Sequence, residues 1–220
     1  MPPNPFVSLG HSVHRALEDY HLKHGSTFDD MMESLNKEWV NEGFESPSQV
    51  QDFYERGQRM LENYWQSNKD IKSEIIHVEK EFRFRLGKNI LRGIIDRIDR
   101  TEDGKYEVID YKTHRELWSS SRIENDMQIS IYSLACEKAL GFKPDILSYY
   151  FLSHDKKISV KRPDSRIKEA VRMIEETADL IKKQVFTPNT TGCAKCDFSG
   201  SCANSTAGRS VRNNGKNIGH

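Results

Sequence analysis

Hydrophobic side chains in the first third of the chain recur at helical spacing. They fall every three or four residues from Ser8 to about His24, and again from about Asp29 to Asn41, where Thr27 or Asp29 can cap the helix. Pro47 suits the first turn of a third helix. The three apolar stripes are Val13, Leu17 and Tyr20; Met32, Leu35 and Trp39; and Val50, Phe53, Tyr54, Met60, Leu61 and Trp65. The pattern predicts a helical region over residues 1–70.

The period then changes from helical to alternating. Apolar side chains fall on alternate positions in the next segment, which is typical of a strand: Ile76, Val78, Phe82, Phe84 and Leu86. Gly87-Lys88-Asn89 turns the chain into a second strand, Ile90 to Arg100. Asp103-Gly104 is a hairpin turn that leads into a third strand, Lys105 to Thr113.

The remaining pattern mixes helices with strands. A helix is predicted from about Ile123 to Leu140, where Gly141 ends it. A fourth strand covers Asp145 to Ser153, and a short fifth covers Ile158 to Lys161. An amphipathic helix follows from Asp164 to about Gln184, with its inward face formed by Ile167, Val171, Ile174, Ala178 and Ile181. These elements predict an α/β (α+β) fold, with a mixed central β-sheet flanked by helices.

Composition narrows the class of protein. No stretch approaches 18 consecutive apolar residues and no secretory signal is visible, so we expect a cytoplasmic (intracellular) protein with no membrane partner. The 33 basic and 33 acidic residues cancel, which disfavours a protein that simply coats nucleic acid. A nuclease remains compatible with this balance, because acidic metal ligands and basic substrate contacts offset one another.

Two predicted strands carry the candidate chemistry. Asp110 and Lys112 are two residues apart in a strand, so their side chains share a face, and the hairpin can bring Asp96 beside them. Two carboxylates suit Mg²⁺ or Mn²⁺, and a neighbouring lysine suits phosphodiester hydrolysis. A surface hairpin with salt bridges is the alternative, but Asp96 lies among isoleucines, where an unpartnered charge is costly. Glu79 and Glu81, one strand earlier, are each a candidate for a further acidic group, but strand alternation and the charge content explain them without a function.

Five motifs in order resemble one family. They are Gly10-His11-Ser12-Val13-His14, Gly93 to Asp99, Val108 to Thr113, Gln128 to Tyr132, and Cys193-x2-Cys196-x5-Cys202. Together they resemble the RecB-like branch of the PD-(D/E)XK nuclease superfamily, similar to CRISPR-associated RecB-like exonucleases, over about residues 4–204. The resemblance implies a restriction-endonuclease-like core.

The resemblance also implies roles for individual residues. His14, Asp96, Asp110 and the carbonyl of Tyr111 would bind Mg²⁺ or Mn²⁺, and Lys112 would be the catalytic lysine. Gln128 and Tyr132, four apart on one helix face, would contact DNA or support Lys112. Core packing is the alternative for Tyr132, and a surface position the alternative for His14. Gly10, one turn before His14, would leave room at the histidine.

The cysteines suit a soft-metal centre. Cys193, Cys196 and Cys202 can bind a 4Fe-4S cluster or zinc, and the resemblance implies the cluster. The family's fourth cysteine, upstream of Gly10, has no counterpart here, and Cys136 fits a buried core thiol better. A truncated N-terminus, a ligand other than cysteine, and the absence of the cluster all remain open.

The segment after Lys112 mixes cations, hydroxyls and an indole. Arg115, Arg122 and the serines can contact phosphates, and Trp118 can either stack on a base or anchor the loop in the core. Lys156, Lys157, Lys161 and Arg162 form either a basic flank or a solvated turn.

These observations predict one nuclease domain over residues 1–207. It comprises the helical region 1–70, a nuclease core over 71–185 and a cysteine segment over 186–207, before a disordered tail over 208–220. The expected activity is metal-dependent exonuclease cleavage of single-stranded or frayed DNA ends, with 5′-to-3′ polarity, in DNA repair or CRISPR adaptation. Partners would be a helicase or CRISPR adaptation proteins. The alternative is a catalytically weak module that binds DNA ends or a helicase.

Overall fold

A computed structural model describes residues 4–196 and 198–207. The chain divides into two compact units, residues 1–175 and 176–220. The expected disordered tail, residues 208–220, lies outside the described residues.

Three helices open the first unit: α1 (Pro5–Leu22), α2 (Phe28–Glu38) and α3 (Pro47–Asn68). All three were predicted, although α1 begins three residues before the expected Ser8, because Asn4 accepts hydrogen bonds from the N–H groups of its first turn. Thr27, one of the two expected caps, begins α2 in a reciprocal capping box with Asp30. Pro47 is in the first turn of α3, as predicted.

Five strands form one mixed sheet in the order β1-β2-β3-β4-β5. The long hairpin of β1 (Glu74–Leu86) and β2 (Asn89–Arg100) continues into β3 (Tyr106–Lys112), and both pairings are antiparallel. β4 (Ile146–Phe151) runs parallel to β3, and β5 (Lys156–Val160) runs antiparallel to β4. The sheet with its flanking helices confirms the predicted fold class.

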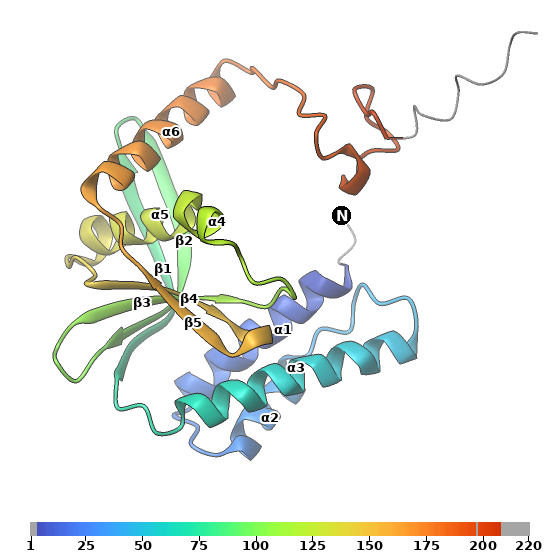
Figure 1. Cartoon of the computed structure of the whole chain (residues 1–220), viewed down its shortest axis with the longest axis vertical. Coiled ribbons are helices and arrows are strands. Elements are labelled where there is room, and N and C mark those ends of the chain that lie inside the picture. The colour runs from blue at the N-terminus through green and yellow to red at the C-terminus, as the bar shows by residue number, and fades with distance from the viewer. Residues whose placement is uncertain (1–3, 197, 208–220) are drawn as a thin grey trace, which may run out of the picture. The chain divides into compact units, whose positions relative to one another are not determined.

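Each face of the sheet has its own hydrophobic core. One core joins α1, α2 and α3 to Ile109, Tyr111 and Tyr150 of the sheet. The other joins Val108 and several further strand residues to the helices that follow β3. Figure 1 shows α1–α3 on one side of the sheet and α4 and α5 on the other. Adjacent residues of β3 therefore face different layers, as strand alternation requires.

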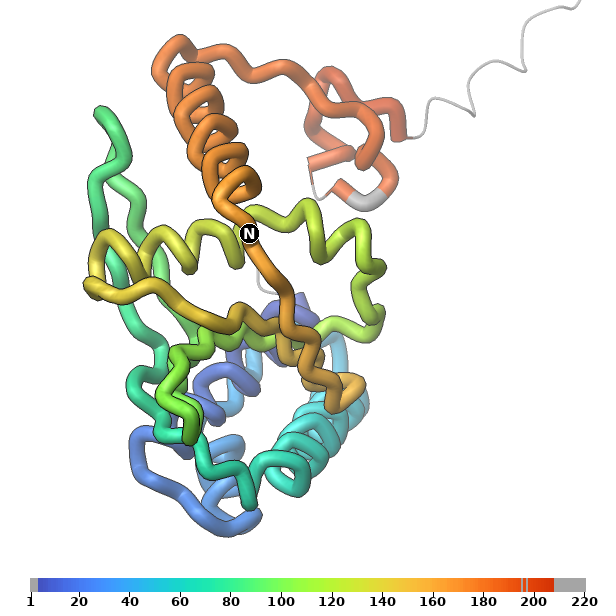
Figure 2. The backbone as a smooth tube through the Cα atoms, turned by 60° about the vertical axis from the view of Figure 1, so that its left-hand side comes forward, coloured from blue at the N-terminus to red at the C-terminus, as the bar shows by residue number. Residues whose placement is uncertain are grey.

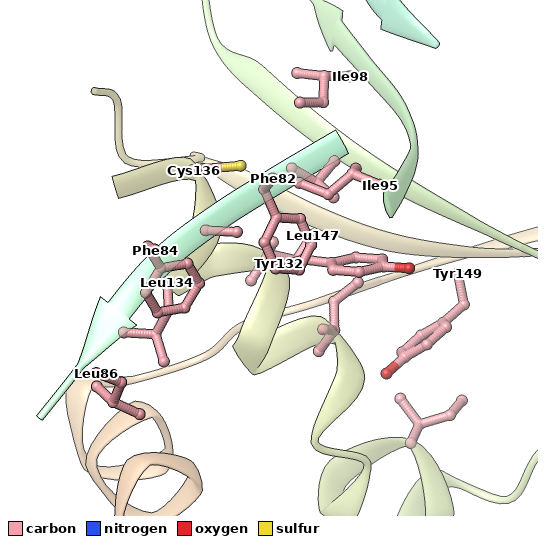
Figure 3. Close-up of a cluster of buried hydrophobic side chains, with 14 of the residues drawn as sticks. Phe82, Phe84, Leu86, Ile95, Ile98, Tyr132, Leu134, Cys136, Leu147 and Tyr149 are labelled. Atoms are coloured by element: carbon pink, nitrogen blue, oxygen red, sulfur yellow. The ribbon is translucent and has the colours of Figure 1, made fainter. Parts of the chain in front are cut away.

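The second core is rich in aromatic side chains. Figure 3 shows Phe82, Phe84 and Leu86 along β1 facing Tyr132 and Leu134 of α5. The outer half of the β1–β2 hairpin extends beyond β3, which pairs only with the last four residues of β2 (Figure 2). Because β3 supports only the inner end of this hairpin, packing against the aromatic core holds the outer half in place.

The single helix predicted over Ile123 to Leu140 is wrong. The segment forms α4 (Ser120–Asn125), then α5 (Gln128–Ala135), then a π-helical turn η1 (Cys136–Leu140). Asp126 interrupts the pattern, because its carboxylate accepts the backbone N–H of Gln128 and the hydroxyl of Tyr149. Gly141 ends η1 in the left-handed region, with φ of 83°, as expected.

Helix α6 (Asp164–Lys182) matches its predicted inward face only in part. Ile167, Val171 and Ile174 pack against the aromatic core, whereas the side chain of Ile181 is 57% exposed. The second unit contains the end of α6 and a short 3-10 turn, η3 (Cys193–Lys195). A turn η2 (Leu152–His154) joins β4 to β5. No helix in the described part of the chain is long and apolar enough to cross a membrane.

Gly93 gives a test of how the hairpin packs. A Cβ at this position would lie 2.7 Å from Cζ of Phe82, whose ring covers the glycine. We expect Gly93→Ala to lower the free energy of unfolding by about 1–3 kcal/mol, because the buried ring must move. Urea denaturation measures the loss. In a Phe82→Ala background the same substitution should cost almost nothing; an undiminished cost would contradict this packing.

Asp19 links α1 to α2 and gives a pH-dependent test. Its carboxylate contacts Lys23 at 2.8 Å, Lys37, and the Ser34 hydroxyl at 2.8 Å. Burial alone would raise the pKa of Asp19, but these three partners lower it to about 2, from an ordinary value of 3.8. A lowered folded-state pKa stabilises the fold above pH 3.8, and this contribution is lost as the pH falls through about 2.

We therefore expect Asp19→Asn to unfold at lower urea concentration than the unchanged protein at pH 7. The difference should shrink steadily between pH 4 and pH 2, measured by urea titration across that range. A difference that did not depend on pH would mean that the carboxylate charge is not what stabilises this contact.

Candidate active site

Strands β2 and β3 separate at the pair of aspartates predicted from the sequence. The last paired residues are Arg97 and Ile109, so continuing the register would place Asp96 opposite Asp110. Instead, Oδ2 of Asp96 accepts the backbone N–H of Tyr111 at 2.7 Å. Both aspartates are buried, with exposed fractions of 7% and 1%. The end of this strand pairing therefore holds two buried carboxylates.

Lys112 connects the aspartates to α5. Its Nζ lies 2.6 Å from Oδ2 of Asp110 and donates to Oε1 of Gln128 at 2.7 Å. Gln128 in turn donates from Nε2 to the hydroxyl of Tyr132 at 2.9 Å. A chain of contacts thus fixes the ammonium group, and the two α5 residues share a helix face as their spacing predicted.

Helix α1 and strand β1 each place one more side chain near Asp96. Nδ1 of His14 lies 3.6 Å from Oδ2 of Asp96 and 3.9 Å from Oε1 of Glu79. Glu79 adopts a positive φ of 44° and is left out of the β1–β2 pairing, between the paired residues Val78 and Lys80. This conformation is unfavourable for a side chain other than glycine, by about 1–3 kcal/mol. Such strain is typical of residues held for a function.

The charged side chains of this site shift the pKa values of one another. Burial raises the pKa of Asp96, to about 7, and repulsion from Asp110 and Glu79 adds to the effect of burial against the attraction of His14. Burial also raises the pKa of Asp110, although Lys112 opposes it. Burial lowers the pKa of His14, but Glu79, Asp96 and Asp110 together outweigh it, so that the pKa is raised overall. The carboxylates therefore lie in a site that favours a bound cation.

The chain matches the model of the PD-(D/E)XK nuclease superfamily over residues 2–203. The chain belongs to this superfamily. Its members are nucleases that use divalent metals, and the coarse reading of the sequence as a metal-dependent nuclease agrees with this membership.

Comparison with solved structures gives a similarity at low sequence identity. The crystal structure of a protein named SSO0001 is 22% identical, and the match covers 89% of this chain and 84% of that chain, with a TM-score of 0.42. A search of the curated proteins finds no significant match.

The donor set in this PD-(D/E)XK chain fits a divalent cation. Ligand atoms of His14, Glu79 and Asp96 lie within 4.8 Å of one another, and they form the one such group of His, Cys, Asp and Glu side chains in residues 4–196 and 198–207. Oδ2 of Asp110 is fully buried and, apart from its ion pair with Lys112, has no aligned hydrogen bond within the described structure. Carboxylate oxygens and one imidazole suit Mg²⁺ or Mn²⁺.

The structure brings together the side chains that the sequence analysis named as metal and catalytic candidates, and it adds one. His14, Asp96, Asp110 and Lys112 lie together, and their roles stay predictions. Glu79, one of the two acids that strand alternation also explained, joins them. Val78 pairs with Arg97 and Lys80 pairs with Ile95, so the register of β1 and β2 places Glu79 opposite Asp96. An acidic residue in the strand before Asp96 was its only signal in the sequence. The role of the Tyr111 carbonyl remains a prediction.

Gly10 serves a different neighbour from the one expected. A Cβ at Gly10 would lie 3.3 Å from the Oγ1 of Thr113, and no atom of His14 is among its near contacts. The glycine therefore lets the end of β3 approach α1. His14 still lies one turn further along the same helix.

Trp118 and the nearby cations have structural contacts. Trp118 is 8% exposed and packs in the aromatic core, with the guanidinium of Arg122 4.2 Å from its ring centre. This supports the core anchor among the two readings of the indole. Lys157 pairs with Glu107 at 3.0 Å, and Arg162 donates to backbone carbonyls. Lys157 and Arg162, two of the four cations of this segment, therefore have partners within the protein.

The cysteines behave in two ways. Cys136 is fully buried in the aromatic core, as expected for a core thiol. In the second unit Cys193 is 9% exposed, while Cys196 and Cys202 are exposed. These three thiols do not form a compact ligand group in the part of the chain that the structure describes.

Metal binding by this nuclease site can be tested without measuring activity. Saturating Mn²⁺ should raise the Tm of the unchanged protein by about 5–10 °C, as expected for a ligand present at about 100 times its Kd. Asp96→Asn and Glu79→Gln should lose most of this shift, because each removes one anionic ligand. Differential scanning calorimetry with Mn²⁺ or EDTA measures it.

Glu81→Gln is the matched control, since Glu81 is an exposed acid on the same strand. It should keep the full Mn²⁺ shift. Equal shifts in all four proteins would mean that the metal binds elsewhere.

Proposed function

We propose that this chain is a divalent-metal-dependent DNA exonuclease that hydrolyses single-stranded or frayed ends with 5′-to-3′ polarity. The convergence of Asp96, Asp110 and Lys112 at the end of the β2–β3 pairing carries the proposal, because it joins buried carboxylates to a fixed ammonium group. The polarity and the preference for single strands rest on the motifs that resemble RecB-like exonucleases.

We propose that His14, Glu79, Asp96 and Asp110 hold the metal, with the Tyr111 carbonyl as a further oxygen ligand. A bound Mg²⁺ or Mn²⁺ supplies Lewis-acid stabilisation of negative charge on the phosphate. The anionic residues restrict the metal to the end of the strand pairing. His14 contributes a nitrogen ligand from α1, on the opposite side of the pocket from α5.

Lys112 acts as the catalytic lysine in this proposal. Hydrolysis forms a bond from a water oxygen to phosphorus and breaks the bond from phosphorus to one sugar oxygen. Asp110 and Gln128 hold the ammonium group at a fixed position, where it donates hydrogen bonds to a phosphate oxygen or orients the attacking water. Tyr132 acts through Gln128 and is a positioning residue, since its hydroxyl accepts from the amide.

The cellular setting is a narrower part of the proposal. The resemblance supports a role inside the cell in DNA repair or CRISPR adaptation, beside a helicase or adaptation proteins. The spacing of Cys193, Cys196 and Cys202 along the sequence supports a 4Fe-4S cluster. The positions of the three thiols in the described structure do not add support for it.

End-labelled single-stranded DNA tests the central proposal. With Mn²⁺ or Mg²⁺ the protein should shorten the strand progressively from its 5′ end, and Lys112→Ala and Asp110→Ala should each reduce the rate by about a hundredfold or more, since each removes a charge that acts on the transition state. Denaturing gels of strands labelled at either end give both rate and polarity. Glu81→Gln should cleave like the unchanged protein.

Two other outcomes would change the conclusion. Cleavage that survives both substitutions would place the chemistry elsewhere. A folded protein that binds DNA ends and never cleaves would instead support the module that binds DNA ends or a helicase.

A further inference from the structure

A cavity of about 580 Å³ opens beside the candidate catalytic lysine. Its wall is formed by the end of β3 and the loop after it, including Lys112 and Arg115, and by Phe6 and Leu9 of α1. A phosphodiester held next to Lys112 would therefore have open space on this side for the nucleotides joined to it.

A second hollow, of about 380 Å³, adjoins the first at Arg115, which lines both. Its wall comes from α3 and from η2, with Arg56, Arg59 and Asn63 on one side and Ser153 and His154 on the other. Arg56, Arg59 and Asn63 are three and four residues apart, so they follow one face of α3. We call Arg56, Arg59 and Arg115 the arginine groove.

The arginine groove has few counter-charges of its own. No Asp or Glu carboxylate of the described residues lies within 4.0 Å of Arg56 or Arg115, and Arg59 has only Glu55, at 3.8 Å. Burial lowers the pKa of Arg56, and the charges of Arg115 and Arg59 lower it further. Three guanidinium groups in mutual repulsion form a site that an anion would stabilise.

One guanidinium is fixed in place by aromatic rings. Arg56 lies over Phe53 at 4.5 Å and over Phe6 at 5.7 Å, measured to the ring centres. Phe6 packs edge-on against Phe53 at 5.2 Å, yet its side chain is 60% exposed at the mouth of the first cavity. An exposed ring beside guanidinium groups is the combination that binds single-stranded nucleic acid, with stacking for bases and cations for phosphates.

We propose that the arginine groove binds the phosphates of the single-stranded DNA that adjoins the scissile bond, and that Phe6 stacks on one of its bases. This inference rests on the proposed function, since it takes Lys112 as the place where the strand is cut. The DNA strand would then leave the candidate active site past the loop after β3 and continue along α3.

Binding under non-cleaving conditions tests this path. Fluorescence anisotropy with a labelled 20-residue oligothymidylate in Ca²⁺ or EDTA gives Kd over a series of salt concentrations. The triple variant Arg56→Gln/Arg59→Gln/Arg115→Gln should bind at least tenfold more weakly. Its slope of log affinity against log salt should be shallower by about 2, from ~0.7 for each lost phosphate contact. Phe6→Ala should weaken binding about tenfold with the slope unchanged.

The matched control removes the same charge from another face. Arg83→Gln/Arg85→Gln/Arg92→Gln lies on the exposed side of the β1–β2 hairpin and should keep the affinity and slope of the unchanged protein. The single variant Arg115→Gln, at an exposed loop position, should lower the slope by about 0.7 even if the triple variant does not fold.

The outcomes separate this inference from the proposed function. Unchanged affinity and slope in the arginine-groove variants, or a loss confined to the hairpin variant, would overturn the path. A protein that binds in this way but never cleaves would leave the path supported and the exonuclease proposal refuted, because the binding measurement needs no turnover.

Discussion

Three carboxylates and a histidine lie close together at the end of the β2–β3 pairing. The rest of the site depends on this concentration of negative charge. Repulsion between carboxylates at short range is weak in water but much stronger where water is excluded. The raised pKa of Asp96 reflects its burial together with repulsion from Asp110 and Glu79, whereas the pKa of Asp110 is raised mainly by burial. Lys112 offsets only the charge of Asp110, so a further cation is the natural partner of His14, Glu79 and Asp96.

The fold holds these groups together through the opposite face of the same strand. Arg97, next to Asp96, points into the layer of α1–α3, where it forms a buried ion pair with Asp99 and donates to the hydroxyl of Tyr64 on α3. The Tyr64 hydroxyl also shares a hydrogen bond with that of Tyr111. The Tyr64 hydroxyl therefore connects β2 and β3 to α3. The strands that carry Asp96 and Asp110 are therefore held against the helical layer that supplies His14.

Much of this arrangement could be predicted from the sequence, because it follows from local rules. Asp110 and Lys112 share a face through the two-residue period of a strand, and Gln128 and Tyr132 share one through the period of a helix. Glu79 could not be assigned in this way, because its place opposite Asp96 depends on the register between β1 and β2, which the alternation within one strand does not fix. The break at Asp126 was hidden for a similar reason: the apolar pattern continues across it, and only tertiary contacts with Tyr149 and the N–H of Gln128 favour the interruption.

The zero net charge illustrates how little a sum says about a nucleic-acid enzyme. The 33 basic and 33 acidic residues cancel in the whole chain, yet they do not cancel locally. Acidic groups concentrate at the end of the β2–β3 pairing, while Arg56 and Arg115 line the adjoining hollows without a carboxylate partner among the residues that the structure describes. A phosphate strand would be attracted along the arginines and repelled by the carboxylates until a divalent cation neutralised them. In this arrangement the metal completes the substrate site as well as the chemistry, so strand binding at the cleavage position and metal binding should be mutually favourable.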